Sequence, residues 1–552
     1  MTWETIAAQK RDLLKASIPA EWVIPQSIMP PESQEDVTDF PKTSGWFTER
    51  ELEITSTPAS LLLKNMATGS WTSESVTRAF CKAAATAHQL TNCLSDMFFD
   101  KAIARARELD AYWNTTGRAK GPLHGLPISL KDSINFIGHD STIGFASLVN
   151  SPATYNSTLV DILLNAGAVL YVKTNVPTAL MFAESVNNVF GRTVNPRNRR
   201  MTPGGSSGGE SALIALGGSR LGVGTDIGGS LRIPAACTGI FALRPSFGRF
   251  PTAKSRPGLA GQEAVCAVNG PMALTLEEVA LWAKIIVDQQ PWLHDPKCLP
   301  IPWRSLSLNP TVKIAVLWHD GHVTPTPPVA RALEQAVAKL KQAGHALVDW
   351  DPKWHRSLLS LHSRMLAADG GRSVTNLLAP TGEPLRKELE EIYAQGVELG
   401  AYDMWQLQLK RNIISGEYLS QWNDSNIDAI LCPTTPYSTV ENGKFAYLGY
   451  TSVWNVLDYP AVSFPCGVNA DKAIDTVYAA KEPLSQIDAQ VHNADGVHGM
   501  PVSLQLVGRR LEDEKTLMMT EVVLKALRHM PKFVKNPGTA RLLVDTTVHR
   551  VR

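Results

Sequence analysis

The sequence has few cysteines for its length, and their arrangement indicates neither a disulfide framework nor a zinc site. Its 552 residues include seven cysteines, at positions 81, 93, 237, 266, 298, 432 and 466. The number is odd, and no two of them form a Cys-x-x-Cys pair. Disulfide-rich secreted domains and zinc sites usually carry paired cysteines at short spacings. We therefore expect free thiols and a reducing compartment.

Long hydrophobic runs are also missing. No stretch approaches the ~18 apolar residues that a membrane-spanning helix needs. The first residues, MTWETIAAQKRDLLKASIPAEW, mix acids with bases and contain neither the apolar core of a signal peptide nor the acid-poor composition of a transit peptide. The sequence thus predicts a cytoplasmic protein without a membrane partner.

Charge of one sign is not in excess. The chain has 53 lysines and arginines against 52 aspartates and glutamates, a formal net charge of +1. Such a balance creates no overall field that would attract nucleic acid or an acidic membrane surface. We therefore expect no nucleic-acid partner and a ligand that is small or uncharged.

Two glycine-rich segments lack the residues of a cofactor-binding loop. Residues 203–211, PGGSSGGES, have no lysine at the place a P-loop requires, and Glu210 would repel phosphate. Residues 222–228, GVGTDIG, have the spacing GxGxxxG in place of the dinucleotide fingerprint GxGxxG. The HDGH segment at His319–His322 has no third ligand at metal spacing. We expect neither a cofactor nor a metal ion.

What the sequence does contain is an alternation of helix-like and strand-like segments. Helical spacing of apolar residues runs through the first 14 residues, and three further helices are expected from Thr72 onward, across 102–112 and across 327–344. Short β-branched apolar stretches predict strands at 168–174, 313–318, 428–435 and 501–508. This alternation is typical of an α/β domain whose central sheet is covered by helices on both faces.

Composition suggests two parts. Residues 1–45 read as an N-terminal helical arm and a polar, proline-containing connector, and 46–552 as the main domain. Within it, residues 300–450 have less glycine and more tryptophan and histidine, so we expect this region to shape specificity. Four tryptophans are candidate aromatic walls of a ligand site: Trp303, Trp318, Trp405 and Trp454.

Three segments carry candidate chemistry: PISLKDS around Lys131, GGSSGGES around Ser206 and GTDIGGSLRIPAAC around Ser230. Lys131 has apolar neighbours, and Asp132 is its only adjacent charge. Desolvation of a lysine can lower its pKa from ~10.4 toward ~7 or 8, where its amine can act as a base. On this stretch alone, a surface lysine in a salt bridge remains the simpler interpretation.

Four long motifs then occur in order: GPLHGLPISLKD, GGSSGGES, GTDIGGSLRIPAACTGIFALRPSFGR and GMPVSLQLVGR. Together they resemble the amidase signature family of serine hydrolases, from about residue 50 to the C-terminus. The shorter segments AEW, LTNC, VKTNVP and GRTVNPRN resemble its fungal acetamidase branch in particular. The resemblance implies that 46–552 is a catalytic domain with the family's mixed, twisted sheet, and that the partner is a small amide. We also consider a homodimer.

The matching positions imply the roles of the site residues. Ser230 corresponds to the nucleophile, Ser206 to the serine that relays protons and Lys131 to the base. A serine hydroxyl attacks poorly until a base takes its proton. A neutral Lys131 could draw that proton through Ser206 and return it to the departing amine, so no histidine is needed.

The resemblance also assigns binding and supporting residues. The oxyanion hole corresponds to the backbone N–H groups of Ile227, Gly228, Gly229 and Ser230. The acyl pocket corresponds to residues 178–183, with Leu180 and Met181 as the expected contacts. Hydrogen-bonding support around the site is expected from Ser207, Asp226 and Arg232, and a packing role from Arg244.

The implied activity is hydrolysis of the C–N bond of small uncharged amides to a carboxylate and ammonia or an amine. Hydrolysis of anilides, carbamates or esters stays open, because an acyl-enzyme tolerates many leaving groups. A glutaminase subunit of a tRNA-dependent amidotransferase is disfavoured by the acetamidase-like arm and the lack of a basic tail. An inactive amide-binding scaffold is disfavoured because Lys131, Ser206 and Ser230 are all present.

Overall fold

The computed structural model describes residues 1–309, 311–394, 396–476, 484–485 and 493–528. In these ranges a sheet of 11 strands forms the centre of the molecule, in the order β1-β3-β2-β6-β8-β7-β12-β13-β11-β9-β10. Its strands are β1 (Leu94–Met97), β2 (Pro127–Lys131), β3 (Val169–Thr174), β6 (Leu221–Asp226), β7 (Phe241–Arg244), β8 (Val268–Ala273), β9 (Lys313–Val316), β10 (Ala346–Asp349), β11 (Ala429–Pro433), β12 (Ala461–Asn469) and β13 (Pro501–Val507). A separate small pair joins β4 (Val186–Asn187) and β5 (Gly191–Arg192).

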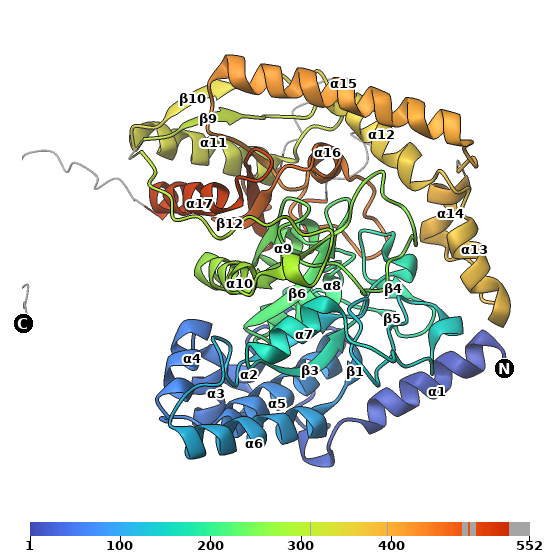
Figure 1. Ribbon diagram of the computed structural model, residues 1–552, viewed down its shortest axis with the longest axis vertical. Coiled ribbons are helices and arrows are strands. Elements are labelled where there is room, and N and C mark those ends of the chain that lie inside the picture. Colours follow the sequence, from blue (N-terminus) through green and yellow to red (C-terminus); the bar gives the residue numbers. More distant parts are fainter. Residues whose placement is uncertain (310, 395, 477–483, 486–492, 529–552) are drawn as a thin grey trace, which may run out of the picture.

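Helices surround this sheet (Figure 1). Those in the first half of the chain are α1 (Trp3–Ala16), α2 (Phe40–Thr43), α3 (Glu49–Ser56), α4 (Ala59–Ala67), α5 (Ser73–Thr91), α6 (Phe99–Thr116), α7 (Thr158–Asn165), α8 (Gly208–Ala215) and α9 (Arg232–Thr238). Those in the second half are α10 (Leu276–Asp288), α11 (Pro327–Gln342), α12 (His355–Leu366), α13 (Arg372–Leu378), α14 (Lys387–Ala394), α15 (Ala401–Ser425), α16 (Gly449–Leu457) and α17 (Asp513–Arg528).

The sheet is mixed. Strand β2 runs parallel to β3 and β6, and β9 runs parallel to β10 and β11. The strands between these two groups pair antiparallel, as does β1 at the edge. Helices α5, α8 and α9 pack against one another along one layer, and α10, α11 and α17 form another. The predicted α/β fold, a central mixed sheet with helices on both faces, is confirmed.

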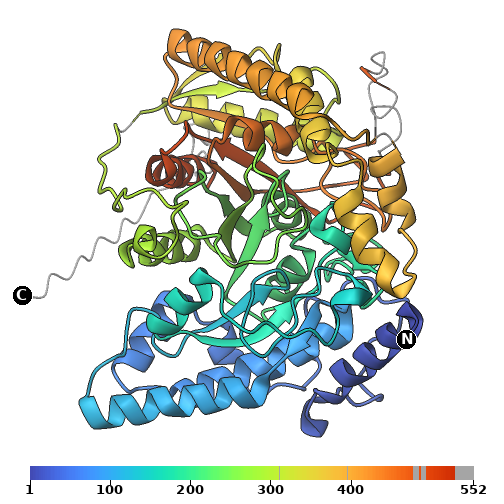
Figure 2. The same cartoon turned by 45° about the vertical axis from the view of Figure 1, so that its right-hand side comes forward.

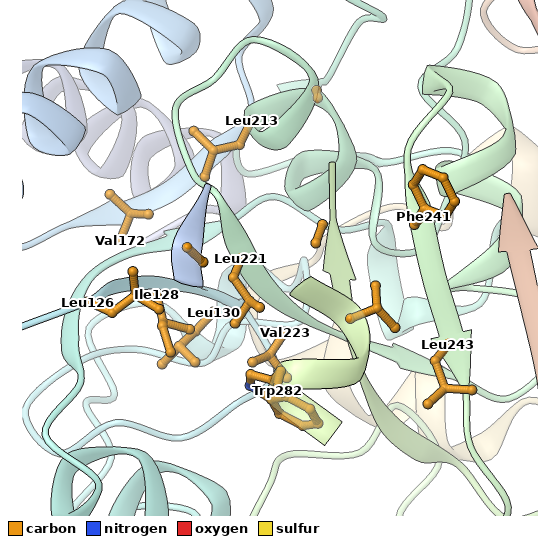
Figure 3. Close-up of a cluster of buried hydrophobic side chains, with 14 of the residues drawn as sticks. Leu126, Ile128, Leu130, Val172, Leu213, Leu221, Val223, Phe241, Leu243 and Trp282 are labelled. Carbon is orange, nitrogen blue, oxygen red and sulfur yellow. The ribbon is translucent and has the colours of Figure 1, made fainter. Parts of the chain in front are cut away.

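The side chains of β2 alternate between these two helical layers. Ile128 and Leu130 belong to the main hydrophobic cluster, together with Val223 of β6 and Trp282 of α10 (Figure 3). Side chains of neighbouring strand residues point to opposite faces of a sheet. The buried Lys131 is therefore directed to the face opposite Leu130, where α8 packs.

Close packing of α8 on the sheet requires glycine in β6. A Cβ atom at Gly222 would come within 1.7 Å of the carboxylate of Glu210, which lies on α8. No side chain fits at such a distance, so the helix can approach β6 only because this position lacks a Cβ. This approach brings the serine-rich loop before α8 to the end of β2.

All four predicted strands exist, as β3, β9, β11 and β13, and they are one to three residues shorter than expected. The expected helices correspond to α1, α5, α6 and α11, and the Thr72 side chain caps α5 by accepting a hydrogen bond from Ser75 N–H at 3.1 Å. Strand β6 was not predicted. Its residues, LGVGTD, contain two glycines, which depress any strand signal in a single sequence.

The N-terminal helix α1 lies along the outside of the molecule (Figures 1 and 2), where it packs against β1 and the short turn Ala146–Leu148. Its Ala7 and Leu14 are buried, and Lys10 forms a salt bridge of 2.8 Å with Asp140. The arm is thus docked on the main body. A domain boundary near residue 45 stays a prediction.

None of the helices in the described ranges is long and apolar enough to cross a membrane. Within the same part of the chain, no three His, Cys, Asp or Glu side chains gather in a way that could hold a metal ion. The cysteines at all seven positions, which fall within those ranges, are free thiols.

Candidate active site

The three sequence segments singled out above meet at one end of β2 and β6. Lys131 is the last residue of β2, Ser206 lies in the loop that enters α8, and Ser230 lies in the loop between β6 and α9. A cavity of about 400 Å³ is lined by both serines and by Thr225, the penultimate residue of β6. The fold therefore brings together residues that are up to 99 positions apart in the chain, from Lys131 to Ser230.

Lys131 is completely buried and held by short hydrogen bonds. Its Nζ donates to Ser206 Oγ at 2.8 Å and to Thr225 Oγ1 at 2.7 Å, and lies 3.5 Å from the Thr225 carbonyl oxygen. Burial lowers the pKa of Lys131 from 10.5 to about 7, although the nearby carboxylates of Asp226, Glu210 and Asp132 oppose the shift. The surface salt bridge is thus excluded, and a neutral amine is accessible near physiological pH.

Ser206 follows a cis peptide bond from Gly205. Its neighbour Ser207 is buried: the Ser207 N–H donates to the Ser230 carbonyl at 3.2 Å, and the Ser207 hydroxyl lies 3.4 Å from the backbone of Thr225. Ser207 therefore links the strand that holds Thr225 to the loop that holds Ser230.

The side chains of Ser206 and Ser230 both reach the cavity, but the two hydroxyls form no hydrogen bond with each other among the described residues. Ser230 is half-buried, and its hydroxyl has no protein partner in that part of the chain. The connection from Lys131 to Ser206 is therefore made in this structure, whereas a hydrogen bond onward from Ser206 to Ser230 is not formed among the described residues.

Three of the four backbone amides expected in the oxyanion hole have no acceptor in the protein. The N–H of Gly229 donates to Asp226 Oδ1 at 2.8 Å, so this amide is already engaged. The N–H groups of Ile227, Gly228 and Ser230 donate to no acceptor among the described residues. The Gly229 N–H is therefore engaged by Asp226 in this structure, and the assignment of the four amides to an oxyanion hole stays a prediction.

Asp226 and Arg232 form a buried clamp beneath this loop. The Arg232 guanidinium donates two hydrogen bonds of 3.0 Å to the Asp226 carboxylate, and Asn455 Nδ2 donates a third of 2.8 Å. Burial alone would raise the pKa of Asp226, but the charge and hydrogen bonds of Arg232 outweigh it and hold the pKa well below the usual range. Asp226 therefore stays ionised, and its carboxylate anchors the loop that carries Ser230.

Two side chains from the C-terminal half also hold the loop, and neither was predicted from the amino-acid sequence. His362 of α12 donates from Nε2 to the Ile227 carbonyl at 3.0 Å, and Thr451 of α16 donates from Oγ1 to the Gly228 carbonyl at 2.7 Å. Thr225 was also missed as the second partner of Lys131. His362 and Thr451 come from segments that only the folded chain brings near the serines, whereas Thr225 lies five positions before Ser230 in the same motif.

Leu180 and Met181 line the cavity, as expected for an acyl pocket. Its remaining wall comes mostly from the irregular loop 251–267 between β7 and β8, which the sequence did not single out. The described residues between 300 and 450 contribute no lining residue to this cavity, and neither do the four candidate tryptophans. Trp454 instead packs against His355 and Tyr418 in a buried aromatic cluster, and Trp405 is 62% exposed.

Arg244 has the packing role that its position implied. It is buried at the end of β7, where its guanidinium donates to the Tyr459 carbonyl and to Asp458 Oδ1, both at 2.9 Å. These contacts join β7 to the turn between α16 and β12. Arg244 does not line the cavity.

Comparisons with known proteins agree with this geometry. The family model described as Amidase matches residues 75–517. The chain is 42% identical to an acetamidase of Emericella nidulans over 544 residues (95% of this chain, 98% of the relative), and 39% identical to an acetamidase of Aspergillus oryzae (96% and 99%). A solved fatty acid amide hydrolase superposes with a TM-score of 0.91 at 34% identity, covering 95% of each chain. A family match across most of the chain, relatives along nearly its full length and a shared fold lead to one conclusion: this chain belongs to the amidase family.

Proposed function

We propose that this protein hydrolyses small uncharged amides to a carboxylate and ammonia or an amine, through an acyl-enzyme on Ser230. The observation that carries the proposal is a buried lysine amine, 2.8 Å from Ser206 Oγ, at the edge of a cavity that Ser230 also lines. Relatives at 39–42% identity, which are acetamidases and an amidase, support amide hydrolysis as the reaction class.

In the proposed mechanism, neutral Lys131 is the base and Ser206 the relay. A neutral lysine has two N–H bonds and one lone pair. The Thr225 carbonyl can only accept, and Thr225 Oγ1 at 2.7 Å takes the second N–H, so the lone pair is left for the Ser206 hydroxyl. Ser206 then passes its proton to Lys131 as it takes the proton of Ser230, which attacks the amide carbon. Reversal of the relay delivers a proton to the leaving nitrogen.

Negative charge then develops on the substrate oxygen. We propose that the free N–H groups of Ile227, Gly228 and Ser230 stabilise it, with Asp226 and Arg232 holding the loop in place. Losing one such donor costs about 2.7–4 kcal/mol of transition-state stabilisation in comparable sites. Water attacks the resulting ester with the same relay acting in turn.

The volume and lining of the cavity indicate which substrates it can hold. Its volume of about 400 Å³ lies within the ordinary range for small-molecule sites and exceeds what a two-carbon acyl group fills. Leu180 and Met181 offer apolar contacts to an acyl chain. We therefore propose that short aliphatic and aryl primary amides are substrates, with anilides, carbamates and esters as slower alternatives. We further propose a cytoplasmic location and a homodimeric assembly.

A panel of amides tests this function. Acetamide, hexanamide, benzamide, acetanilide, a carbamate and an ester are each incubated with the purified protein, and release of ammonia, amine or acid is followed. The proposal expects turnover of primary amides that is abolished in Ser230→Ala. A protein that hydrolyses only esters, or that turns over amides equally well without Ser230, would contradict it.

A further inference from the structure

The loop proposed to bind the oxyanion is held from outside by a buried histidine. His362 lies on α12, within the region 300–450 that contributes nothing to the cavity wall. Its side chain is 3% exposed, and its Nε2 lies 3.0 Å from the Ile227 carbonyl oxygen. A carbonyl oxygen can only accept, so this nitrogen carries the proton. Burial lowers the pKa of His362 from its usual value, which favours the neutral ring.

This contact fixes the direction of one backbone amide. The C=O of Ile227 and the N–H of Gly228 belong to the same peptide group, and in a trans peptide they point in opposite directions. Anchoring the carbonyl on α12 therefore turns the Gly228 N–H away from that helix. The amide has no protein acceptor there, and its neighbours Ile227 and Ser230 both line the cavity.

Two hydrogen bonds hold the next peptide group, which joins Gly228 to Gly229. Thr451 Oγ1 binds the Gly228 carbonyl at 2.7 Å, and Asp226 Oδ1 accepts from the Gly229 N–H at 2.8 Å. His362 is the one side chain among the described residues that holds the peptide group before it. The ring also fills the space beside the loop, since a Cβ at Gly228 would come 3.0 Å from it.

We propose that His362 is a positioning residue that aims the Gly228 N–H at the developing oxyanion. This inference rests on the proposed function. In this proposal the region 300–450 takes part in catalysis by holding the backbone of the 227–230 loop, and not by lining the cavity.

The test compares His362→Leu, which lacks the donor, with His362→Gln, whose side-chain amide can replace it. In His362→Leu we expect kcat for a primary amide to fall about 10- to 100-fold, less than the ~10²–10³-fold of deleting an oxyanion donor outright. KM should change less than about threefold, because the amide is needed only as charge develops. Affinity for a trifluoromethyl ketone, which forms a charged tetrahedral adduct, should fall by the same factor as kcat. His362→Gln should recover most of both.

His355→Leu is the matched control. His355 is a second buried histidine on the same helix, but its Nε2 lies 3.2 Å from Tyr418 Oη, away from the loop. This variant should lose stability and keep kcat.

The role of His362 is overturned if His362→Leu keeps the kcat of the wild type, if kcat falls while ketone affinity does not, or if folded His362→Gln is as slow as a folded His362→Leu. Should His362→Leu fail to fold, His362→Gln decides: near-wild-type kcat and ketone affinity support the role, and joint loss of both overturns it. A wild-type protein that hydrolyses no amide would contradict the proposed function itself, and this inference with it.

Discussion

Lys131 Nζ and Thr225 Oγ1 lie 2.7 Å apart although the two residues are 94 positions apart in the chain. The parallel pairing of β2 and β6, with Leu130 opposite Val223, brings them together. A buried amine with a hydrogen-bond acceptor on the adjacent strand has a fixed direction. The position of the proposed base is thus set by the register of the sheet.

The pH dependence of kcat/KM should report this amine. Because Lys131 acts as a base only when neutral, and its pKa is about 7, activity should rise with pH across 7 and level off above about 8. The measurement is a pH profile of amide hydrolysis from pH 5 to 9. A flat profile across this range would contradict the assignment of Lys131 as the base.

Glu210→Gln serves as the control for that profile. Burial raises the pKa of Glu210 to about 7 as well, so a limb near 7 could belong to either group. The negative charge of Glu210 raises the pKa of Lys131, so its removal should move the limb to lower pH. If the limb disappears in Glu210→Gln, it belongs to the glutamate.

Thr225→Val tests the direction of the amine. The variant keeps the shape of the side chain but removes the hydroxyl that takes one lysine N–H. We expect kcat to fall about tenfold or more, since a general base contributes about 10²–10⁴-fold in all and part of this depends on its orientation. Steady-state kinetics with benzamide measures the change, with Thr238→Val, a buried threonine outside the cavity, as the control. Equal losses in both variants would show that the effect is structural.

Asp226→Asn should be strongly destabilising. It leaves the fully buried Arg232 without a counter-charge and replaces an acceptor of several hydrogen bonds. Removing one partner of a buried ion pair typically costs about 3–5 kcal/mol. Urea unfolding followed by fluorescence measures the loss. The exposed pair Lys284–Asp288 offers the control, because Asp288→Asn should cost less than about 1 kcal/mol. A loss of similar size in both would contradict the clamp.

Leu180→Ala should shift the choice of acyl group. Leu180 lines the cavity, and its removal leaves room for a longer or branched chain. The ratio of kcat/KM for hexanamide to that for acetamide should rise about tenfold, near the lower end of what one or two methylenes contribute in an apolar pocket. Leu293→Ala, at a side chain that is 66% exposed, is the control and should leave the ratio unchanged. An unchanged ratio in Leu180→Ala would place the acyl chain elsewhere.

The sequence predicted the parts of this molecule that local patterns encode. Apolar periodicity located α5, α6 and α11 together with four strands, and the ordered motifs around Lys131, Ser206 and Ser230 predicted the site. The motifs are long and contiguous, so they can be recognised without knowing how the chain folds.

The rest depends on contacts between distant segments, which no local pattern records. His362 lies in an amphipathic helix and Thr451 in a helix that is buried along its whole length. Both matter only because α12 and α16 pack beside the 227–230 loop. The irregular loop 251–267 carries no motif, yet it makes most of the cavity wall. The hydrogen bond from the Gly229 N–H to Asp226 was not predicted either, because no local pattern shows that this carboxylate turns back onto that amide.

The central claim is that Ser230 is the nucleophile, and covalent labelling tests it most directly. A serine-reactive phosphonate is added, and the tryptic peptides are analysed by mass spectrometry. Cleavage after Arg220 and Arg232 releases residues 221–232, in which Ser230 is the sole serine, whereas Ser206 lies in the peptide 201–220. The account predicts the adduct on 221–232 and none in Ser230→Ala. An adduct on 201–220, or undiminished labelling of Ser230→Ala, would contradict it.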